Sequence, residues 1–346
     1  MLAENGPRGR GGLTEKELKS PENCIWFCSE HAHIVDNNRG VAYPPEELLA
    51  YKALQQARIS RERQGLFIPV GWLFEVVMRQ SPIFQSGERI RLAKLNLILV
   101  DNGTGKTAIA EWIAGFFQPG GLGRWHRWGL PVDVEMTFLN PSSHRLRLQI
   151  GPSESLRYNV DGQEVPFIGM PLTIVRVGRL DFGENEGDDV ALSRILSLPP
   201  QTVQNLFTEI DRFPHSRLRN LHYERDDEDG RLNLHLDLDG TVPELPLRSL
   251  STREIDRVFI ELATAAARVS GQHTPTLLIL DGCPRIVFEG FFDFYSHHFL
   301  DPENHFQALM CIPSTDIDLE NLRWCGWELI QTVGKKPNVT ITQQAT

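Results

Sequence analysis

The sequence predicts an α/β protein with a parallel core sheet, an antiparallel β subdomain, a short helical arm and a small N-terminal α appendage. Two observations predict the parallel core. The apolar run Asn96–Val100 leads into a glycine-rich turn, and Thr276–Asp281 is an unbroken apolar run that ends in an acid. Strands buried on both faces of a parallel sheet have this continuous apolar character. A separate observation predicts the antiparallel subdomain: apolar and polar residues alternate over 132–138, 144–150 and 156–160, as in a half-exposed antiparallel sheet.

The composition limits the classes of protein to be considered. A chain of 346 residues, 41% of them hydrophobic, is long enough for one large α/β domain with an appendage. It has no apolar run that could cross a bilayer and no signal-peptide region, so we expect a cytoplasmic protein without a membrane partner. Five scattered cysteines agree with a reducing compartment. The formal net charge of −10 gives no support to DNA binding, which would need a local patch or a partner subunit.

The chain is predicted to divide into an N-terminal appendage, residues 1–65, and a large domain, residues 66–346. The appendage begins with Gly-, Arg- and Pro-rich sequence and ends in a polar helix, Glu46–Gln64. Within the large domain, residues 181–247 are expected to form a compact arm or lid, the part most free to vary between related proteins. The elements expected in this arm are two helices, 190–198 and 202–213, and a hairpin with strands at 221–223 and 232–238.

The glycine-rich turn after the first apolar strand has the residues of a phosphate-binding P-loop. Its sequence is Asp101-Asn102-Gly103-Thr104-Gly105-Lys106-Thr107. Backbone N–H groups in such a turn surround a phosphate, and the N-terminus of the following helix adds its positive end. Lys106 is expected to reach the outer phosphates, and the Thr107 hydroxyl to coordinate Mg²⁺. Val100 replaces the usual first glycine. An ordinary strand–turn–helix is the alternative, but it does not explain the Lys-Thr pair.

A second motif lies at the start of a predicted helix, between the P-loop and the strand that ends at Asp281. The helix opens with Leu250-Ser251-Thr252-Arg253-Glu254 and has one apolar stripe, formed by Ile255, Val258, Phe259, Leu262, Ala265, Ala266 and Val269. Ser-x-x-Glu at a helix start is a capping box, which needs no ligand to explain it. The motif therefore has a structural interpretation that is complete by itself.

The order of these three elements resembles that of the ABC-type ATPases, and more closely their SMC-like and defence-associated branch. The resemblance covers residues 66–333 and implies ATP and Mg²⁺ as cofactors. It implies that Lys106 and Thr107 bind phosphate and Mg²⁺, and that Asp281 holds Mg²⁺ directly or through water. It also implies a head-to-tail homodimer, in which Ser251 contacts the γ-phosphate bound by the other protomer. The alternative for Asp281 is a cap for the next turn.

Several departures from the family bear on catalysis. Thr252 and Arg253 stand where the family signature has glycine, so these side chains either block the close approach to phosphate or allow Arg253 to donate its guanidinium to it. The resemblance places Ser251, Arg253 and Glu254 among the nucleotide-binding residues. The glutamate that polarises the attacking water is replaced by Gly282, and loss of such a base costs on the order of 10²–10⁴ in rate. Glu289 substitutes for it only if the chain folds back. We therefore expect ATP binding with slow or absent hydrolysis.

The appendage resembles the second half of an HNH-like zinc module found at the N-termini of bacterial defence proteins. The residues that carry this resemblance are Asn23–Asp36 and Pro45–Lys52. It implies zinc ligands at Cys28 and His31, with His31 replacing the second cysteine, which zinc chemistry permits. The other two ligands and the catalytic strand of a nuclease would precede Met1. We expect a remnant that docks a partner or the second protomer; packing of Cys28 and His31 without metal is the alternative.

Two functional hypotheses follow from these observations. In the first, the chain is an ATPase subunit of a bacterial anti-phage defence-type complex, and its nucleotide-dependent dimerisation controls a separate effector such as a nuclease. In the second, it is a non-catalytic scaffold stabilised by nucleotide that assembles or inhibits a partner. Val100, Arg253 and Gly282 favour the second hypothesis. A DNA-repair ATPase is a weaker alternative because the net charge is acidic and the arm is short.

Overall fold

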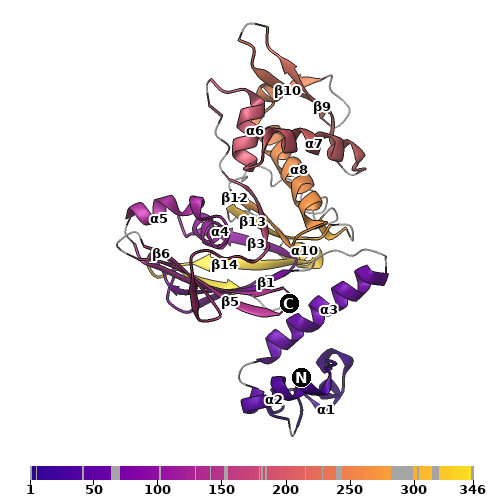
Figure 1. Ribbon diagram of the computed structural model, residues 1–346, viewed down its shortest axis with the longest axis vertical. Helices are drawn as coiled ribbons and strands as arrows, with labels where there is room; N and C mark the ends of the chain where they lie inside the picture. Colours follow the sequence, from indigo (N-terminus) through magenta and orange to yellow (C-terminus); the bar gives the residue numbers. More distant parts are fainter. Residues whose placement is uncertain are drawn as a thin grey trace. The chain divides into compact units, whose positions relative to one another are not determined.

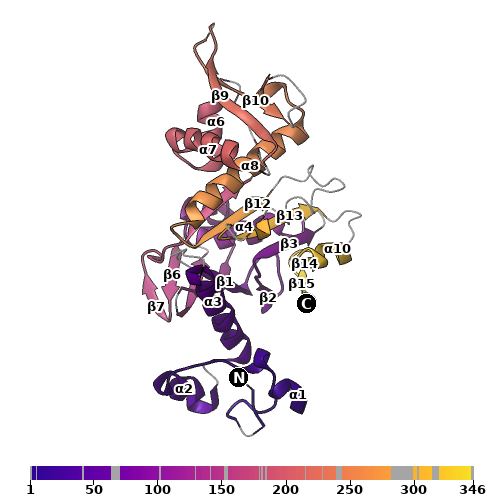
Figure 2. The same cartoon turned by 90° about the vertical axis from the view of Figure 1, so that its right-hand side faces the viewer.

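The chain forms two compact units, Met1–Val70 and Gly71–Thr346 (Figures 1 and 2). The computed structural model describes every residue except 1, 5, 41–42, 64–70, 101–102, 129, 141, 152–154, 179, 181, 184, 215, 228, 239–243, 282–298, 302–303, 314–318 and 344–346. In the part of the chain that it describes, no helix is long and apolar enough to span a membrane.

The N-terminal unit is helical. Its elements are α1 (Glu15–Leu18), η1 (Pro21–Asn23), α2 (Ser29–Asp36), η2 (Asn37–Gly40) and α3 (Pro45–Arg63). The long helix α3 is the polar helix expected over 46–64. The buried Arg8 side chain donates hydrogen bonds to the Asp36 carboxylate and the Tyr43 carbonyl, both at 2.8 Å, and so joins the first residues of the chain to α2 and to the segment before α3.

The large unit is built on a six-stranded sheet in the order β15-β14-β3-β13-β12-β8. The strands are β3 (Leu95–Val100), β8 (Thr173–Val177), β12 (Thr276–Asp281), β13 (Phe306–Pro313), β14 (Trp327–Val333) and β15 (Thr340–Gln343). All pairs are parallel except β14 with β15. All six residues of β12 are buried, which confirms the strand predicted from its continuous apolar sequence.

The second sheet is antiparallel, in the order β2-β1-β4-β5-β6-β7. Its strands are β1 (Trp72–Gln80), β2 (Glu88–Arg91), β4 (Val132–Leu139), β5 (Ser143–Ile150), β6 (Leu156–Val160) and β7 (Gln163–Val165). Burial alternates along β5, with Leu146 and Leu148 buried and Arg145 and Arg147 exposed, as the sequence predicts. The turn between β6 and β7 is Asp161-Gly162, and both of its residues have positive φ, 52° and 89°.

Each face of the parallel sheet has its own core. Leu277 and Ile279 of β12 point to one face, where they join a cluster with helix α4 (Lys106–Gly115) and the inner residues of the antiparallel sheet. Leu278 and Leu280 point to the other face, which is covered by α8 (Thr252–Gly271) and the arm. The strands of the parallel sheet are therefore fixed between two apolar layers. The described part of the unit also contains the short helices η3 (Pro119–Leu122), α5 (Gly123–Trp128) and α10 (Leu319–Trp324).

The arm is compact and contains both helices and strands. Its elements are α6 (Asp188–Leu196), α7 (Pro200–Arg212), β9 (Leu218–Arg225), β10 (Leu232–Leu238), β11 (Leu245–Pro246) and η4 (Leu247–Ser249). The strands form a small antiparallel sheet in the order β11-β10-β9, and Leu234, Leu236 and Leu238 of β10 are buried on one face. Figure 1 shows α8 running from the arm to the parallel sheet, so the arm is joined to the strand β12 through one long helix.

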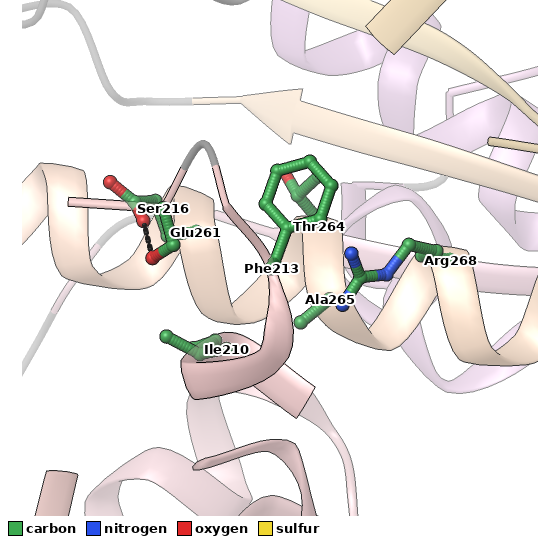
Figure 3. A pocket seen from close by; sticks show the side chains of 7 residues that line it. All are labelled: Ile210, Phe213, Ser216, Glu261, Thr264, Ala265 and Arg268. Carbon is green, nitrogen blue, oxygen red and sulfur yellow. Dashed lines mark hydrogen bonds between the residues drawn. The ribbon is translucent and has the colours of Figure 1, made fainter. Parts of the chain in front are cut away.

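A buried carboxylate fastens α8 to the arm. Glu261 of α8 is 4% exposed and accepts hydrogen bonds from the Ser216 hydroxyl and the Arg217 backbone N–H, the latter at 3.1 Å. It lines a cavity of about 10 Å³, which is large enough for one water molecule at most (Figure 3). Burial raises the pKa of the Glu261 carboxyl, against the lowering effect of the Ser216 and Arg217 hydrogen bonds. Its Oε1 atom has no hydrogen-bond partner among the described residues.

We expect Glu261→Gln to remove a pH-dependent contribution to stability. The raised pKa means that the folded protein holds this proton more tightly than the unfolded chain, in which a glutamate titrates near about 4.3. The contribution is therefore full below that pH and is lost as the pH rises through the folded pKa. The free energy of unfolding of the unmodified chain, measured against Glu261→Gln by urea denaturation, is expected to fall as the pH rises. Exposed Glu164→Gln is the matched control; identical profiles for the two variants would contradict the prediction.

Candidate nucleotide-binding site

The glycine-rich turn has the backbone geometry of a phosphate-binding loop. Gly103 and Gly105 have φ of 91° and 109°, a region that L-residues rarely adopt. Helix α4 begins at Lys106, and its N-cap is Gly105, which has no side chain to cap the first N–H groups of the helix. Such N–H groups bind anions. Asp101 and Asn102, also expected in the site, lie outside the described residues.

The position of residue 105 requires glycine because Phe84 and Ile83 lie close to its Cα atom. A Cβ atom on it would lie 2.6 Å from Cζ of Phe84 and 2.9 Å from Cγ2 of Ile83. Both neighbours are buried, at 2% and 5% exposed, and belong to the core beneath the loop. Gly103 differs because a Cβ atom added to it would have no neighbouring atom within 4 Å. The turn is thus held against the core at Gly105 and is open at Gly103.

The structure brings together two residues that the sequence places in the site, Thr107 and Asp281. Thr107 is in the first turn of α4, and Asp281 is the last residue of β12. The Thr107 hydroxyl donates a hydrogen bond to Oδ1 of Asp281 at 3.2 Å. A hydroxyl and a carboxylate are oxygen ligands of the kind that Mg²⁺ prefers, so this pair fits the metal that the motif implies.

Asp281 also forms an ion pair that the sequence did not predict. Its other oxygen, Oδ2, lies 3.2 Å from Nη2 of Arg176, on the neighbouring strand β8. The same Nη2 atom is 3.8 Å from Oε1 of Glu111, one turn after Thr107 in α4. The only hint in the sequence was that Arg176 and Glu111 are single charges within apolar segments, Thr-Ile-Val-Arg-Val and Ala-Ile-Ala-Glu-Trp-Ile-Ala.

Glu111 has further partners in α5. Its Oε2 atom accepts a hydrogen bond from Nε1 of Trp125 at 2.8 Å and pairs with Nε of Arg124 at 2.6 Å. Burial raises the pKa of the Glu111 carboxyl, Arg124 and Trp125 oppose the rise, and the charge of Asp281 adds to it. Acids and arginines therefore alternate in a row from Asp281 on β12 through Arg176 on β8 and Glu111 on α4 to Arg124 on α5.

Two further contacts hold the loop on its other sides. The hydroxyls of Thr104 and Thr332 are 3.0 Å apart, which joins the loop to β14. Sγ of Cys311, on β13, lies 4.0 Å from the Lys106 carbonyl. Burial raises the pKa of the Cys311 thiol, and the nearby Asp281 charge raises it further. A neutral thiol is therefore part of the floor of the site rather than a nucleophile.

The motif at Ser251 forms the capping box that the sequence predicts. The Ser251 hydroxyl accepts a hydrogen bond from the Glu254 N–H at 3.4 Å, and the Glu254 carboxylate accepts one from the Ser251 N–H at 2.7 Å. Arg253 is exposed and forms no ion pair with the described residues. The start of α8 is therefore an ordered, exposed helix end, and its contact with nucleotide stays a prediction.

The structure describes the remaining predicted site residues only in part. Gly282 and Glu289 lie outside the described residues. Cys28 is exposed and directly precedes α2, and the side chain of His31 is not described. Among the described residues there is no group of three or more His, Cys, Asp or Glu side chains placed to hold a metal.

Comparison with known proteins identifies the fold. Neither protein-family models nor curated proteins match the chain. An SMC head bound to the C-winged helix domain of ScpA matches with a TM-score of 0.55 and 11% identity, over 79% of this chain and 98% of that one. An SMC head bound to the C-terminal domain of ScpA, derived from Pyrococcus furiosus, gives 0.53 and 9%, over 80% and 97%. RecF with ATP, a recombination mediator, gives 0.50 and 11%, over 80% and 99%.

At these identities the similarity concerns the fold alone. The chain has the ABC-type P-loop fold that SMC heads and RecF share, which confirms the predicted fold class. What the chain binds has to be argued from its own residues.

Proposed function

We propose that this chain binds ATP with Mg²⁺ at the loop after β3 and acts as an SMC-like ABC-type ATPase subunit. The observation that carries the proposal is the meeting of the Thr107 hydroxyl and the Asp281 carboxylate, 174 positions apart, at 3.2 Å beside the Gly105 turn. The N–H groups at the start of α4 and the Lys106 ammonium bind the phosphates, and the Thr107 hydroxyl and the Asp281 carboxylate are the oxygen groups placed to face the Mg²⁺ that accompanies the nucleotide. When bound, Mg²⁺ neutralises and orients the phosphate oxygens.

The proposal includes a head-to-tail homodimer. The exposed start of α8, with Ser251 and Arg253, is suited to face the nucleotide of a second protomer, because an ordered helix N-terminus attracts phosphate. Gly282 supplies no base for the attacking water, so hydrolysis is slow or absent. In this proposal ATP binding, rather than turnover, controls a separate effector such as the nuclease of a bacterial anti-phage defence complex.

A nucleotide-stabilised scaffold is the second candidate function. The ion pair between Arg176 and Asp281 favours it, because a carboxylate that is already paired has less charge to offer a catalytic metal. In this case ATP joins the two protomers as a structural ligand, and the chain assembles or inhibits its partner without turnover.

The N-terminal unit is proposed as the docking part of the chain. Trp26 is 97% exposed, and aromatic side chains are enriched at protein–protein interfaces. Zinc binding by Cys28 and His31 stays a hypothesis, and metal analysis of the purified protein tests it. DNA binding has no support from the charge of the chain.

The test of the proposed function is ATP binding, measured by titration calorimetry together with turnover on the same sample. Lys106→Ala is expected to raise the dissociation constant about 10- to 100-fold, because hydrogen bonds to charged groups contribute about 1.5–3 kcal/mol. Lys335→Ala, in an exposed turn of the same unit, is the matched control and is expected to bind as the unmodified chain does.

The outcomes separate the two candidate functions. Lys106-dependent binding with turnover, even slow turnover, establishes an ATPase and excludes the non-catalytic scaffold. Lys106-dependent binding without turnover excludes catalysis and leaves ATP as a ligand that acts through binding alone. Sedimentation of the same samples with and without ATP reports the dimer. Absence of ATP binding, or binding that Lys106→Ala leaves unchanged, overturns the proposal.

A further inference from the structure

The Arg176 guanidinium contacts the buried carboxylate of Asp281, the residue proposed to face the metal. Asp281 is 4% exposed and offers two oxygens, of which Oδ1 accepts the Thr107 hydroxyl and Oδ2 contacts Arg176, each at 3.2 Å. The Arg176 side chain is 22% exposed, so this ion pair is largely removed from water. Both oxygens of the carboxylate are thus engaged by groups of the chain itself.

The position of Arg176 is fixed by its surroundings. It lies in the middle of β8, where its backbone is paired in register with Ile279 of β12, two residues before Asp281. Its Nη2 atom contacts Glu111 as well as Asp281, at 3.8 and 3.2 Å. Two carboxylates therefore hold the guanidinium, and it remains beside Asp281.

The consequence is electrostatic. A guanidinium next to a buried carboxylate lowers the negative potential that the carboxylate offers to any other cation, and the effect is strong because screening by water is weak there. A divalent ion that approaches Asp281 must share or displace Arg176. If Arg176 were removed, neither Asp281 nor Glu111 would have its guanidinium as a counter-ion, and the negative potential at the site would increase.

We propose that Arg176 is an internal counter-ion that competes with divalent metal for Asp281, so that nucleotide binding at this P-loop depends only weakly on Mg²⁺. The proposal deepens the proposed function and rests on it in its nucleotide part. It assigns Arg176 a positioning and specificity role: it compensates the charge of Asp281 in the absence of metal and disfavours a tightly held ion. Glu111 contacts the same Nη2 atom as Asp281, at 3.8 Å, and so helps to keep the guanidinium in place.

The first measurement is the dissociation constant of ATP by titration calorimetry, in Mg²⁺ and in EDTA. For the unmodified chain the two values are expected to agree within about threefold. Arg176→Met, which keeps the apolar stem of the side chain, is expected to show about tenfold or more tighter binding in Mg²⁺ than in EDTA, as the loss of one charge-assisted contact implies. Arg176→Lys restores the charge and is expected to return toward the weak dependence. Arg157→Met, on the exposed strand β6, is the control.

The second measurement uses metal alone. Mn²⁺ is titrated into nucleotide-free protein and followed by electron paramagnetic resonance. The unmodified chain is expected to bind no Mn²⁺ at this site, and Arg176→Met is expected to bind it in a manner that Asp281→Asn abolishes.

The two measurements test the role of Arg176 separately from the proposed nucleotide binding. Mn²⁺ binding by the unmodified chain that Asp281→Asn removes would overturn the inference, and this result requires no Arg176 variant to fold. An unchanged Mg²⁺ dependence in Arg176→Met and Arg176→Gln would overturn it too. If ATP does not bind in a Lys106-dependent way, the proposed function fails, while the Mn²⁺ titration still decides the role of Arg176.

Discussion

Gly105→Ala is expected to lower the free energy of unfolding by about 2–5 kcal/mol and to remove nucleotide binding. Two costs add at this position. An L-residue held at positive φ costs roughly 1–2 kcal/mol, and the φ of Gly105 is 109°. Overpacking of a core typically costs about 1–3 kcal/mol, and the added methyl would lie 2.6 Å from the buried Phe84 ring. Relief of this contact moves the loop away from the core, and with it the N–H groups proposed to bind phosphate.

Gly103→Ala separates these two costs. Gly103 has a similar φ, 91°, but nothing lies within 4 Å of the position of its added methyl. Only the backbone cost remains, so we expect a loss of about 1–2 kcal/mol. Urea denaturation of both variants and the unmodified chain measures the difference. Equal losses would show that the contact of Gly105 with Phe84 has no role in holding the loop.

Arg248→Met is expected to destabilise the large unit by about 3–5 kcal/mol. Asp188, at the start of α6, has a side chain only 1% exposed, and its charge is compensated by Nε of Arg248 at 2.8 Å. Its other oxygen accepts the Leu234 N–H at 2.9 Å. The Arg248 side chain is itself 37% exposed, but its removal leaves the buried Asp188 charge uncompensated, and an uncompensated buried charge costs about this amount. Arg248 precedes Ser251 by three residues, so the change also loosens the segment that leads into α8.

Arg194→Met is the matched control in the same arm. Arg194 pairs with Glu186, but its side chain is 50% exposed. Exposed pairs contribute about 0–1 kcal/mol, so the control is expected to lose no more than that. Thermal and urea unfolding of the two variants measure the contrast. A loss in Arg248→Met as small as in Arg194→Met would mean that Asp188 does not depend on Arg248 for its charge compensation.

Sequence patterns predicted these elements of the fold because each element depends on interactions between residues close together in the chain. A strand between two apolar layers needs apolar residues at every position, and 276–281 has them. A capping box needs only Ser and Glu three residues apart, so Ser251 and Glu254 were sufficient to predict it. The Asp161-Gly162 turn likewise needs two residues that accept positive φ.

The charge partners of the candidate site were not predicted, because they belong to segments far apart in the chain. Arg176 contacts Asp281 only because β8 and β12 are neighbours in the sheet, and no pattern within either strand specifies that order. Asp188 and Arg248 are separated by 60 positions and meet where α6 packs beside β10 and η4. A single charge in an apolar segment indicates a partner but does not identify it.

The sequence by itself determined the strand–turn–helix with Lys106 and Thr107, the capped helix start at Ser251 and the buried strand that ends at Asp281. These are contacts within a few residues, where backbone geometry and apolar periodicity decide the outcome. The tertiary structure alone decided that Asp281 meets Thr107 on one oxygen and Arg176 on the other. Strand order is set by packing of the two cores, and Coulomb energies depend on distances that only this packing defines.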